Sequence, residues 1–209
     1  MTLDEGRDVS SRVLIVATGV VDVLPDIPGV GEAWGTGVVH CPYCHGAEHR
    51  GERTAVFGAD DAAYHMARLL RGWTDDITVV TNGQEGPGEE MEAQLEREGT
   101  PILRSPIARL RLAGAEVRGI EFDDGSVLDC DVLYMKPPQR FASPIAERLG
   151  ARVTSEERID ADADGRTGVQ GLFVAGDILN RAQQVATAIG GGAWAGIAAN
   201  HDLLLGPPE

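Results

Sequence analysis

The sequence has little positive charge, no long apolar run and few cysteines. Its 18 lysines and arginines face 33 aspartates and glutamates, so the formal net charge is −15. A surface this acidic repels phosphate, and we therefore expect no binding to nucleic acid or to an anionic membrane. No stretch of about 18 apolar residues is present to form a transmembrane helix. The first residues contain no basic, apolar leader, so no secretory signal is visible and we expect a cytoplasmic protein.

Cysteine is scarce, since three residues in a chain of 209 do not make a disulfide scaffold. Two of them stand in the string Cys41-Pro42-Tyr43-Cys44, and this spacing in a cytoplasmic protein indicates redox chemistry or metal binding. A helix that starts at such a pair stabilises a thiolate. The next residue, His45, could hold or pass a proton during thiol exchange. We therefore take Cys41, Cys44 and His45 as candidate catalytic residues.

Three other interpretations of this string stay open. Cys-x-x-Cys-His is also the attachment sequence of c-type haem, but that reading needs an export compartment and no export signal is visible. A zinc site needs four ligands, and the one further cysteine of the sequence is Cys130. The pair could also be two inert cysteines. We favour redox chemistry over all three and expect no metal.

Glycine, by contrast, is abundant at 27 residues, about twice its usual share. Such an excess indicates tight turns and close backbone approaches, as in dinucleotide-binding folds. The sequence also contains a repeat, because residues 3–16 align with residues 122–135 at an offset of 119 without a gap. Each copy predicts an acidic-glycine turn, a short strand and a buried apolar strand. Two copies of one such unit predict two related domains.

A predicted strand, turn and helix precede the second copy. Residues 53–58 predict a strand that ends in glycine, residues 62–71 a helix and residues 77–81 the next strand, as at the opening of a Rossmann βαβ unit. Gly58 precedes the turn glycine Gly125 by 67 residues. The same spacing in the first copy would place its strand, turn and helix before the first residue. We therefore expect the chain to begin inside a domain.

The turn after the strand at residues 53–58 departs from the dinucleotide pattern Gly-x-Gly-x-x-Gly/Ala. Gly58 and Ala63 fit its outer positions, but Asp60 stands where the backbone should approach a pyrophosphate. No arginine for NADP closely follows the strand that ends at Val80, and Glu85 is too far along the loop to bind the ribose of NAD. We expect a domain that keeps the fold and has lost its dinucleotide. A nucleotide site of unusual geometry is the alternative.

Two further apolar segments end in glycine-containing turns. Residues 14–19 and 171–177 each predict a buried strand, and the carboxylate that ends the second can accept hydrogen bonds from a polyol or a ribose. Residues 22–34 contain several prolines and glycines and predict a linker. Residues 183–201 predict a helix that is broken by a run of three glycines. The start of this helix can face an anion or a carbonyl group.

Together these features resemble the low-molecular-weight thioredoxin reductases, a family of FAD-dependent pyridine nucleotide–disulfide oxidoreductases. The matching pieces are Ala17-Thr18-Gly19, Cys41-x-x-Cys44, Gly171 to Asp177, and Gln184 with the glycine-rich helix after it. The resemblance implies an α/β, Rossmann-like FAD/NAD(P)-binding fold with two dinucleotide-binding domains, in which the first FAD-binding βαβ unit is missing. Residues 1–32 and 136–209 would be pieces of the FAD domain, and residues 33–135 the inserted NAD(P)-binding-like domain with the cysteine pair.

The resemblance also implies roles for individual residues. Cys44 would face the flavin, and Cys41 would attack a partner disulfide. Asp177 would bind the ribityl chain of FAD, and Gln184 and Val185 would lie near the isoalloxazine ring. The other cofactor-binding candidates are Thr18, Gly19 and Gly176 for FAD, with Gly58 and Ala63 at the second nucleotide position. A homodimer is implied as well, acting on a small dithiol or disulfide substrate or on a thioredoxin-like protein.

Departures from the family pattern point to a subgroup. His45 stands where the family has aspartate, and the FAD-pyrophosphate fingerprint and the NADPH-binding arginines are absent. The strings Cys-Pro-Tyr-Cys-His-Gly and Gly72-Trp73-Thr74-Asp75-Asp76 are similar to those of dithiol oxidases, which pass electrons from a dithiol through the cysteine pair and FAD to oxygen. We therefore expect FAD-dependent dithiol oxidation without NAD(P)H, and weak or no FAD binding by this chain alone. The alternatives are an NADPH-dependent thioredoxin-disulfide reductase and a non-catalytic fragment or interaction module.

The remaining conspicuous side chains have structural interpretations. His49, His65 and His201 follow no spacing pattern and are expected at the surface. Trp34, Trp73 and Trp194 are expected to anchor packing. Cys130 aligns with a serine in the first repeat copy, so we expect it to fill the core.

Overall fold

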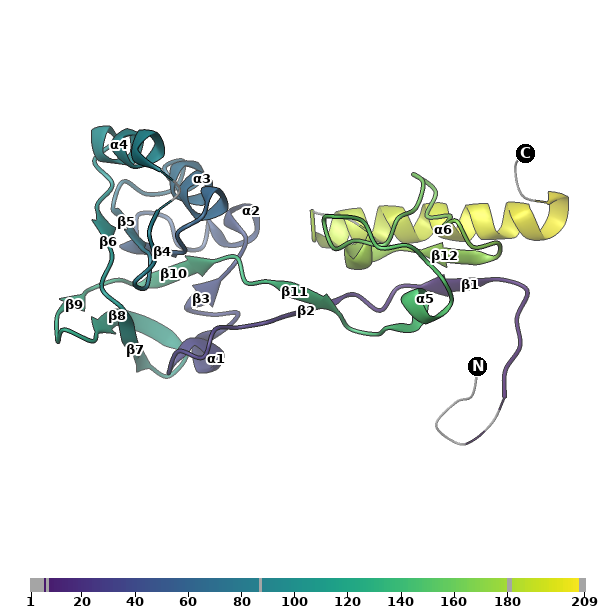
Figure 1. The fold of residues 1–209 in the computed structure, drawn as a ribbon, viewed down its shortest axis with the longest axis horizontal. Helices are drawn as coiled ribbons and strands as arrows, with labels where there is room; N and C mark the ends of the chain where they lie inside the picture. Colours follow the sequence, from purple (N-terminus) through teal and green to yellow (C-terminus); the bar gives the residue numbers. More distant parts are fainter. Residues whose placement is uncertain (1–5, 7, 87, 180–181, 207–209) are drawn as a thin grey trace. The chain divides into compact units, whose positions relative to one another are not determined.

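The computed structural model describes residues 6, 8–86, 88–179 and 182–206. The chain divides into two compact units, both of mixed α/β structure (Figure 1). Unit 1 consists of residues 1–22 and 139–209, and unit 2 consists of residues 23–138. Unit 2 is therefore inserted into the sequence of unit 1.

The unit boundaries differ from those expected at residues 32 and 135. The residues that follow Asp22 do not form a linker, because Ile27, Val30 and Ala33 are buried in the core of unit 2. The prolines and glycines of this segment interrupt regular structure, but its apolar side chains still pack as part of the unit. The first boundary accordingly lies after Asp22 and the second after Pro138.

Unit 2 is built on a parallel sheet of five strands in the order β3-β10-β4-β5-β6. The strands are β3 (Val38–Val39), β10 (Val132–Met135), β4 (Thr54–Phe57), β5 (Ile77–Val80) and β6 (Ile102–Leu103). The three central strands are rich in apolar residues and almost wholly buried, as expected for a parallel sheet that is covered on both faces.

Helices and a second sheet cover the two faces of this parallel sheet (Figure 1). One face packs against α3 (Asp61–Leu70) and α4 (Glu89–Arg97). The other packs against the antiparallel strands β7 (Ile107–Ala113), β8 (Glu116–Phe122) and β9 (Val127–Leu128) and the short helix α1 (Val30–Ala33). The predicted strand, turn, helix and next strand are confirmed as β4, α3 and β5.

The second repeat copy has its predicted form. Its acidic-glycine turn joins β8 to β9, and the Phe122 N–H donates to the Ser126 carbonyl oxygen at 3.0 Å. The buried strand of this copy is β10. In the first copy the apolar strand is present as β1 (Leu14–Val16), whereas residues 3–5 and 7 lie outside the described residues.

Unit 1 contains two pairs of strands. β1 runs parallel to β12 (Leu172–Val174), and β2 (Val20–Asp22) pairs antiparallel with β11 (Gln139–Phe141). A core that includes α5 (Ile145–Arg148) and the 3-10 turn η1 (Gly176–Ile178) covers one face of the parallel pair. The long helix α6 (Val185–Leu205) covers the other face.

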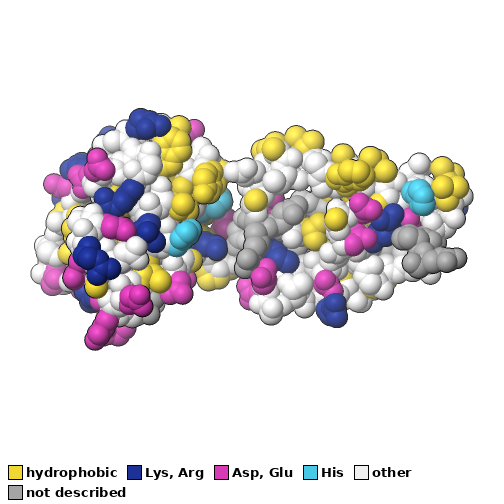
Figure 2. All heavy atoms as spheres, turned by 90° about the horizontal axis from the view of Figure 1, so that it is seen from above, with side chains coloured by type: hydrophobic (Ala, Val, Ile, Leu, Met, Phe, Trp, Pro, Cys, Tyr) yellow, Lys and Arg dark blue, Asp and Glu magenta, His cyan; other side chains and the backbone are white. Residues whose placement is uncertain are grey.

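Helix α6 runs without interruption through the three glycines at 190–192, so the predicted break is wrong. A glycine weakens a helix by about 1 kcal/mol relative to alanine but does not by itself end it. Here Ala195, Ala198 and Ala199 are buried on one side of the helix, whereas Trp194 and Ile197 are more than half exposed. Hydrophobic side chains are accordingly visible over α6 in Figure 2. Within the described part of the chain, no helix is long and apolar enough to cross a membrane.

Candidate functional site

The cysteine pair lies at the start of a short helix that follows the buried strand β3. Cys41 is the N-cap of α2 (Pro42–His45), and proline occupies the first helical position, where its fixed backbone angle suits a helix start. The N–H groups of Cys44 and His45 both donate to the Cys41 carbonyl oxygen at 3.1 Å. Cys41 is half-buried and Cys44 is exposed, and no disulfide joins the two. The predicted helix start at this pair is confirmed.

His45 is the last residue of α2, directly after Cys44. Its Nδ1 atom lies 3.1 Å from Oε2 of Glu48, and the His45 side chain is 30% exposed. A carboxylate in this place favours the tautomer that carries hydrogen on Nδ1, which leaves Nε2 as the acceptor. The ring can therefore hold or release a proton beside the cysteine pair.

Trp73 fixes the end of α2 by packing against Gly46. A Cβ atom at position 46 would lie 2.4 Å from Nε1 of Trp73 and 2.4 Å from the Pro42 carbonyl oxygen, so a larger residue does not fit without a shift. The Trp73 carbonyl oxygen accepts a hydrogen bond from the Gly51 N–H at 3.0 Å, and the guanidinium group of Arg50 lies 4.7 Å from the indole centroid. The expectation that Trp73 anchors packing is confirmed.

The four other histidines differ in their surroundings. The ring of His40, just before Cys41, stacks on Trp34 with centroids 6.2 Å apart. His49 was expected at the surface, but its side chain is only 17% exposed and its Nδ1 atom lies 2.8 Å from Oε2 of Glu52. Sequence reasoning missed both contacts because an isolated histidine gives no periodic signal. His65 and His201 are exposed, as expected.

The side chain of Asp60 caps a helix, and it stands at the position where a dinucleotide turn needs glycine. It is the N-cap of α3, and its Oδ1 atom accepts a hydrogen bond from the Ala63 N–H at 2.9 Å. That N–H belongs to the helix terminus that would face a phosphate. Gly58 has φ of +135°, and a Cβ atom there would lie 2.8 Å from the Cβ of Ala63. Gly58 and Ala63 thus allow strand and helix to approach closely.

The polar side chains that follow β5 also form hydrogen bonds within the fold. The buried Thr81 donates its hydroxyl hydrogen to the Gln84 carbonyl oxygen at 2.8 Å. Asn82 adopts φ of +52°, and its Oδ1 atom accepts a hydrogen bond from the Ile107 N–H at 2.7 Å. No arginine stands between Thr81 and Glu96. The residues after β5 therefore offer no guanidinium group to a 2′-phosphate.

The residues predicted for the flavin lie in unit 1, around the carboxyl ends of β1 and β12. The two strands end in register at Val16 and Val174, and the Ala175 N–H donates to the Val16 carbonyl oxygen at 3.1 Å. The predicted residues after β1 are Thr18 and Gly19, those after β12 are Gly176 and Asp177, and Gln184 and Val185 begin α6. Carboxyl ends of parallel strands are where α/β folds bind ligands.

The backbone at these strand ends leaves room for a ligand. Gly19 has φ of +72° and no atom within 4 Å of a Cβ built on it, and Gly176 has φ of +77° with its nearest such neighbour, Ala188, at 4.0 Å. Gln184 is the N-cap of α6 and forms a reciprocal capping box with Thr187. Asp177 is partly exposed. These residues fit the ribityl and ring end of FAD.

Sequence reasoning missed the residues that support Asp177. Arg158 donates to the Asp177 carbonyl oxygen at 3.1 Å and to Oε1 of Gln139 at 3.1 Å. Gln139 in turn donates to Oδ1 of Asp22 at 2.8 Å and is linked to Gln183. These partners are 19 to 117 positions apart in sequence, so no local motif could have indicated them.

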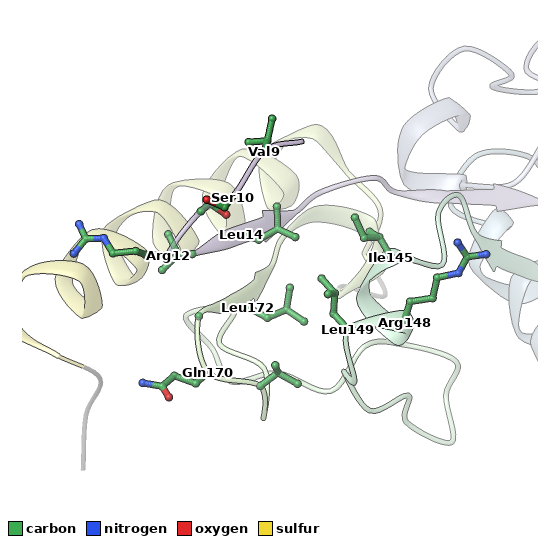
Figure 3. A pocket seen from close by; sticks show the side chains of 13 residues that line it. Val9, Ser10, Arg12, Leu14, Ile145, Arg148, Leu149, Gln170 and Leu172 are labelled. Atoms are coloured by element: carbon green, nitrogen blue, oxygen red, sulfur yellow. The ribbon is translucent and has the colours of Figure 1, made fainter. Parts of the chain in front are cut away.

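An apolar pocket of about 490 Å³ lies in unit 1 (Figure 3). Its lining comes from residues 9–14, from α5 with Leu149, and from residues 169–172. Leu14 and Leu172, which line it, are the first residues of β1 and β12. The pocket is therefore at the amino ends of the two strands, opposite the end that carries the predicted flavin residues.

Cys130 is a core residue, as expected. It is 2% exposed and packs in the core between the parallel and antiparallel sheets of unit 2. Burial, with a further contribution from the charge of Asp131, raises the pKa of the Cys130 thiol to about 12. The thiolate is the reactive form of cysteine, so Cys130 is inert at neutral pH.

Residues 1–192 match the family model for pyridine nucleotide-disulphide oxidoreductases. The chain is 32% identical over 211 residues to the protein named thioredoxin reductase tcpT of Claviceps purpurea, covering 96% of this chain and 65% of the relative. The solved structure of HlmI is 32% identical with a TM-score of 0.91, covering 97% of this chain and 64% of HlmI.

A third similar protein is an oxidoreductase from Agrobacterium tumefaciens, with 35% identity and a TM-score of 0.87. The match covers 99% of this chain and 68% of that protein. The chain therefore spans slightly less than two thirds of the Claviceps protein and of HlmI. The predicted Rossmann-like fold and the predicted family are confirmed. The chain belongs to the pyridine nucleotide-disulphide oxidoreductase family.

Proposed function

We propose that this chain carries the thiol–disulfide exchange centre of an FAD-dependent oxidoreductase and that it oxidises a small dithiol. The observation that carries the proposal is the arrangement of the half-buried Cys41 and the exposed Cys44 around a helix start, with His45 and its carboxylate partner beside them. A helix N-terminus favours a thiolate, which is the form that attacks a disulfide or leaves from one.

The exchange starts from the oxidised pair and conserves atoms and electrons. A substrate thiolate attacks Sγ of Cys41, the Cys41–Cys44 bond breaks, and Cys44 leaves as a thiolate. The second substrate thiolate then attacks the substrate sulfur of the mixed disulfide, and Cys41 leaves as a thiolate. Two electrons pass to the cysteine pair and the substrate becomes a disulfide. His45 accepts a substrate thiol proton on Nε2, and its Nδ1 hydrogen stays directed to Glu48.

FAD would supply the two-electron acceptor that returns the pair to the disulfide form. Asp177 would hold the ribityl chain, and Gly19 and Gly176 would leave the space that the cofactor needs. Gln184 and Val185, at the start of α6, would lie near the ring. Arg158 holds the Asp177 backbone in position. No Gly-x-Gly-x-x-Gly turn follows a strand in the 209 residues to hold the pyrophosphate.

Two observations favour oxidation of a dithiol over reduction by NADPH. Asp60 places a carboxylate at the phosphate position of the turn and binds the N–H of Ala63. Residues 81–96, which follow β5, contain no arginine, and Oδ1 of Asn82 is bound to the backbone N–H of Ile107. The second candidate function is an NADPH-dependent reductase with a thioredoxin-like partner. The name of the Claviceps relative, thioredoxin reductase, favours that candidate.

The test compares dithiothreitol with NADPH as electron donor. Under anaerobic conditions the oxidised full chain with added FAD should consume up to two equivalents of dithiothreitol, one that reduces the cysteine pair and one whose electrons pass on to FAD, and the flavin absorbance should fall. NADPH should leave the absorbance unchanged. Cys44→Ser should abolish the dithiol response, and Cys130→Ala should preserve it. Rapid bleaching by NADPH would favour the reductase, and a chain that consumes no dithiol would be the non-catalytic module.

A further inference from the structure

The buried strand β10 carries a hydroxyl group without a hydrogen-bond partner. Tyr134 is 1% exposed, and its hydroxyl oxygen has no partner in the part of the chain that the structure describes. Buried hydroxyl groups are nearly always hydrogen-bonded, because an unpartnered one loses water and gains nothing in return. A phenylalanine would fill the same space without that penalty. The hydroxyl group therefore needs a reason other than packing.

The sheet register places Tyr134 next to the approach to the cysteine pair. Tyr134 is paired with Val39 in the neighbouring strand β3, two residues before Cys41. On the same side of the sheet, the ring of His49 meets the Tyr134 ring edge-on, with centroids 6.3 Å apart. The phenol thus lies on the strand next to the one that leads to Cys41.

The charges near the phenol keep it protonated. Burial raises the pKa of Tyr134, and negative charge on Cys41, Glu48 and Glu52 raises it further. The phenol therefore remains an O–H donor over the range in which thiols ordinarily ionise, about pH 7 to 9.5. The same negative charge that disfavours a phenolate attracts the partly positive hydrogen of the Tyr134 hydroxyl group. The surrounding charge therefore favours a hydrogen bond from this hydroxyl group to a thiolate.

Building on the exchange proposed above, we propose that the Tyr134 hydroxyl group donates a hydrogen bond to the Cys41 thiolate once that thiolate forms. The hydrogen stays on Tyr134, and the charged sulfur is stabilised relative to the thiol. Among the described residues no acceptor, sulfur included, is hydrogen-bonded to the hydroxyl group, so the contact has to form as Cys41 becomes charged. The donor makes Cys41 a better leaving group in the second exchange step.

The test measures alkylation of Cys41 by iodoacetamide as a function of pH in the full chain carrying Cys44→Ser. Cys130 does not compete, because it is buried and its thiol pKa is raised to about 12. Tyr134→Phe should move the midpoint of the profile upward by about 0.5 to 1 pH unit, which slows alkylation at pH 7 about 3- to 10-fold. A Tyr134→Phe profile that superimposes on the parent profile would overturn the proposal.

Tyr64→Phe is the matched control. Tyr64 is also fully buried in unit 2, but its hydroxyl group already has a partner, because it donates to Oε1 of Glu92 at 3.4 Å. Its removal should leave the alkylation midpoint unchanged and lower the urea midpoint of unfolding. Tyr134→Phe should keep or raise the urea midpoint, because it removes a group without a partner. A merely structural role would instead lower stability and leave the pH profile in place.

The titratable groups around Tyr134 besides Cys41 include Glu48, His49, Glu52 and Tyr64. Parent and Tyr134→Phe chains share all of them, so a difference between the two profiles belongs to the hydroxyl group. Alkylation needs no flavin and no electron donor. The proposed dithiol oxidation can therefore fail while this proposal stands, and the reverse outcome is equally visible.

A second measurement needs no change at Tyr134. The chain has three tyrosines, so 3-fluorotyrosine labelling of the Cys44→Ser chain gives three fluorine resonances, assigned with Tyr43→Phe and Tyr64→Phe. The Tyr134 resonance should move at the pH of the Cys41 alkylation midpoint, and Cys41→Ser should remove that movement. A Tyr134 resonance that does not move at the Cys41 midpoint would overturn the proposal, even if the Tyr134→Phe chain did not fold.

Discussion

Asp60 caps α3 with its carboxylate, at a turn position where a dinucleotide fold needs bare backbone. Asp60→Ala should lower the free energy of unfolding by about 1 kcal/mol, because the Ala63 N–H loses its partner. Asp60→Asn should change it little, since asparagine caps equally well. Urea denaturation followed by circular dichroism measures both. Equal stability of the parent and Asp60→Ala would contradict the capping role.

Gly46 and Trp73 hold the end of the cysteine-bearing helix by direct contact. Gly46→Ala should destabilise unit 2 by about 1 to 3 kcal/mol, because its Cβ atom would meet both Trp73 and the Pro42 carbonyl oxygen at 2.4 Å. The shift should also slow alkylation of Cys41 and Cys44. Gly72→Ala is the control, since the nearest neighbour of its Cβ atom is 3.5 Å away. If both variants unfolded alike, the contact with Trp73 would not be decisive.

Single residues could be predicted from sequence where a local pattern defines their place. The spacing of Cys41 and Cys44 indicated a helix start, and the repeat alignment indicated a core position for Cys130. The partners of Arg158 could not be predicted, because they come from segments brought together only by folding. The unpartnered hydroxyl group of Tyr134 could not be predicted either, since the sequence indicates only an apolar strand.

At the scale of elements, an ion pair joins the starts of β4 and β10. Arg53 donates to both carboxylate oxygens of Asp131, at 2.9 and 2.7 Å, and these hydrogen bonds lower the pKa of Asp131. A lowered pKa means that the stabilisation is present above the unfolded value of about 4 and is lost as pH falls through the folded value. Asp131→Asn should therefore reduce the urea midpoint at pH 7, and the difference from the parent should shrink below about pH 4.

The matched control for this pair is Asp129→Asn. Asp129 lies 3.9 Å from Arg53 and its side chain is 70% exposed, so solvent screens the interaction. Its replacement should change the urea midpoint less than Asp131→Asn does. A difference between Asp131→Asn and the parent that persisted unchanged at pH 3 would show that ionisation of Asp131 is not its cause.

The elements themselves could be predicted where periodicity and breakers agree, as in β4, α3 and β5. Two predictions failed where glycine and proline were weighed above packing. The three glycines do not break α6, because buried alanines on one side hold the helix together. Residues 23–33 are not a linker, because their apolar side chains enter the core of unit 2. In both places tertiary contacts outweigh local propensity.

At the scale of the whole molecule, the predicted flavin residues belong to unit 1 and the cysteine pair to unit 2. The repeat predicted two related domains, and the family resemblance implied that one is inserted into the other, although the unit boundaries differ from those expected. The two chemistries can therefore be measured separately in one chain. Thiol alkylation reports on unit 2, and flavin content reports on unit 1.

The flavin content of the purified chain tests how far unit 1 can hold FAD. No glycine fingerprint follows a strand in the 209 residues, so the pyrophosphate lacks its usual backbone donors. We expect less than one FAD per chain, measured as flavin absorbance released by heat against protein concentration. Asp177→Ala should reduce it further, whereas Asp75→Ala, at an exposed position of unit 2, should not. One tightly bound FAD per chain would mean that the strand ends and the start of α6 suffice, and cofactor affinity would then reside in the ribityl and ring contacts.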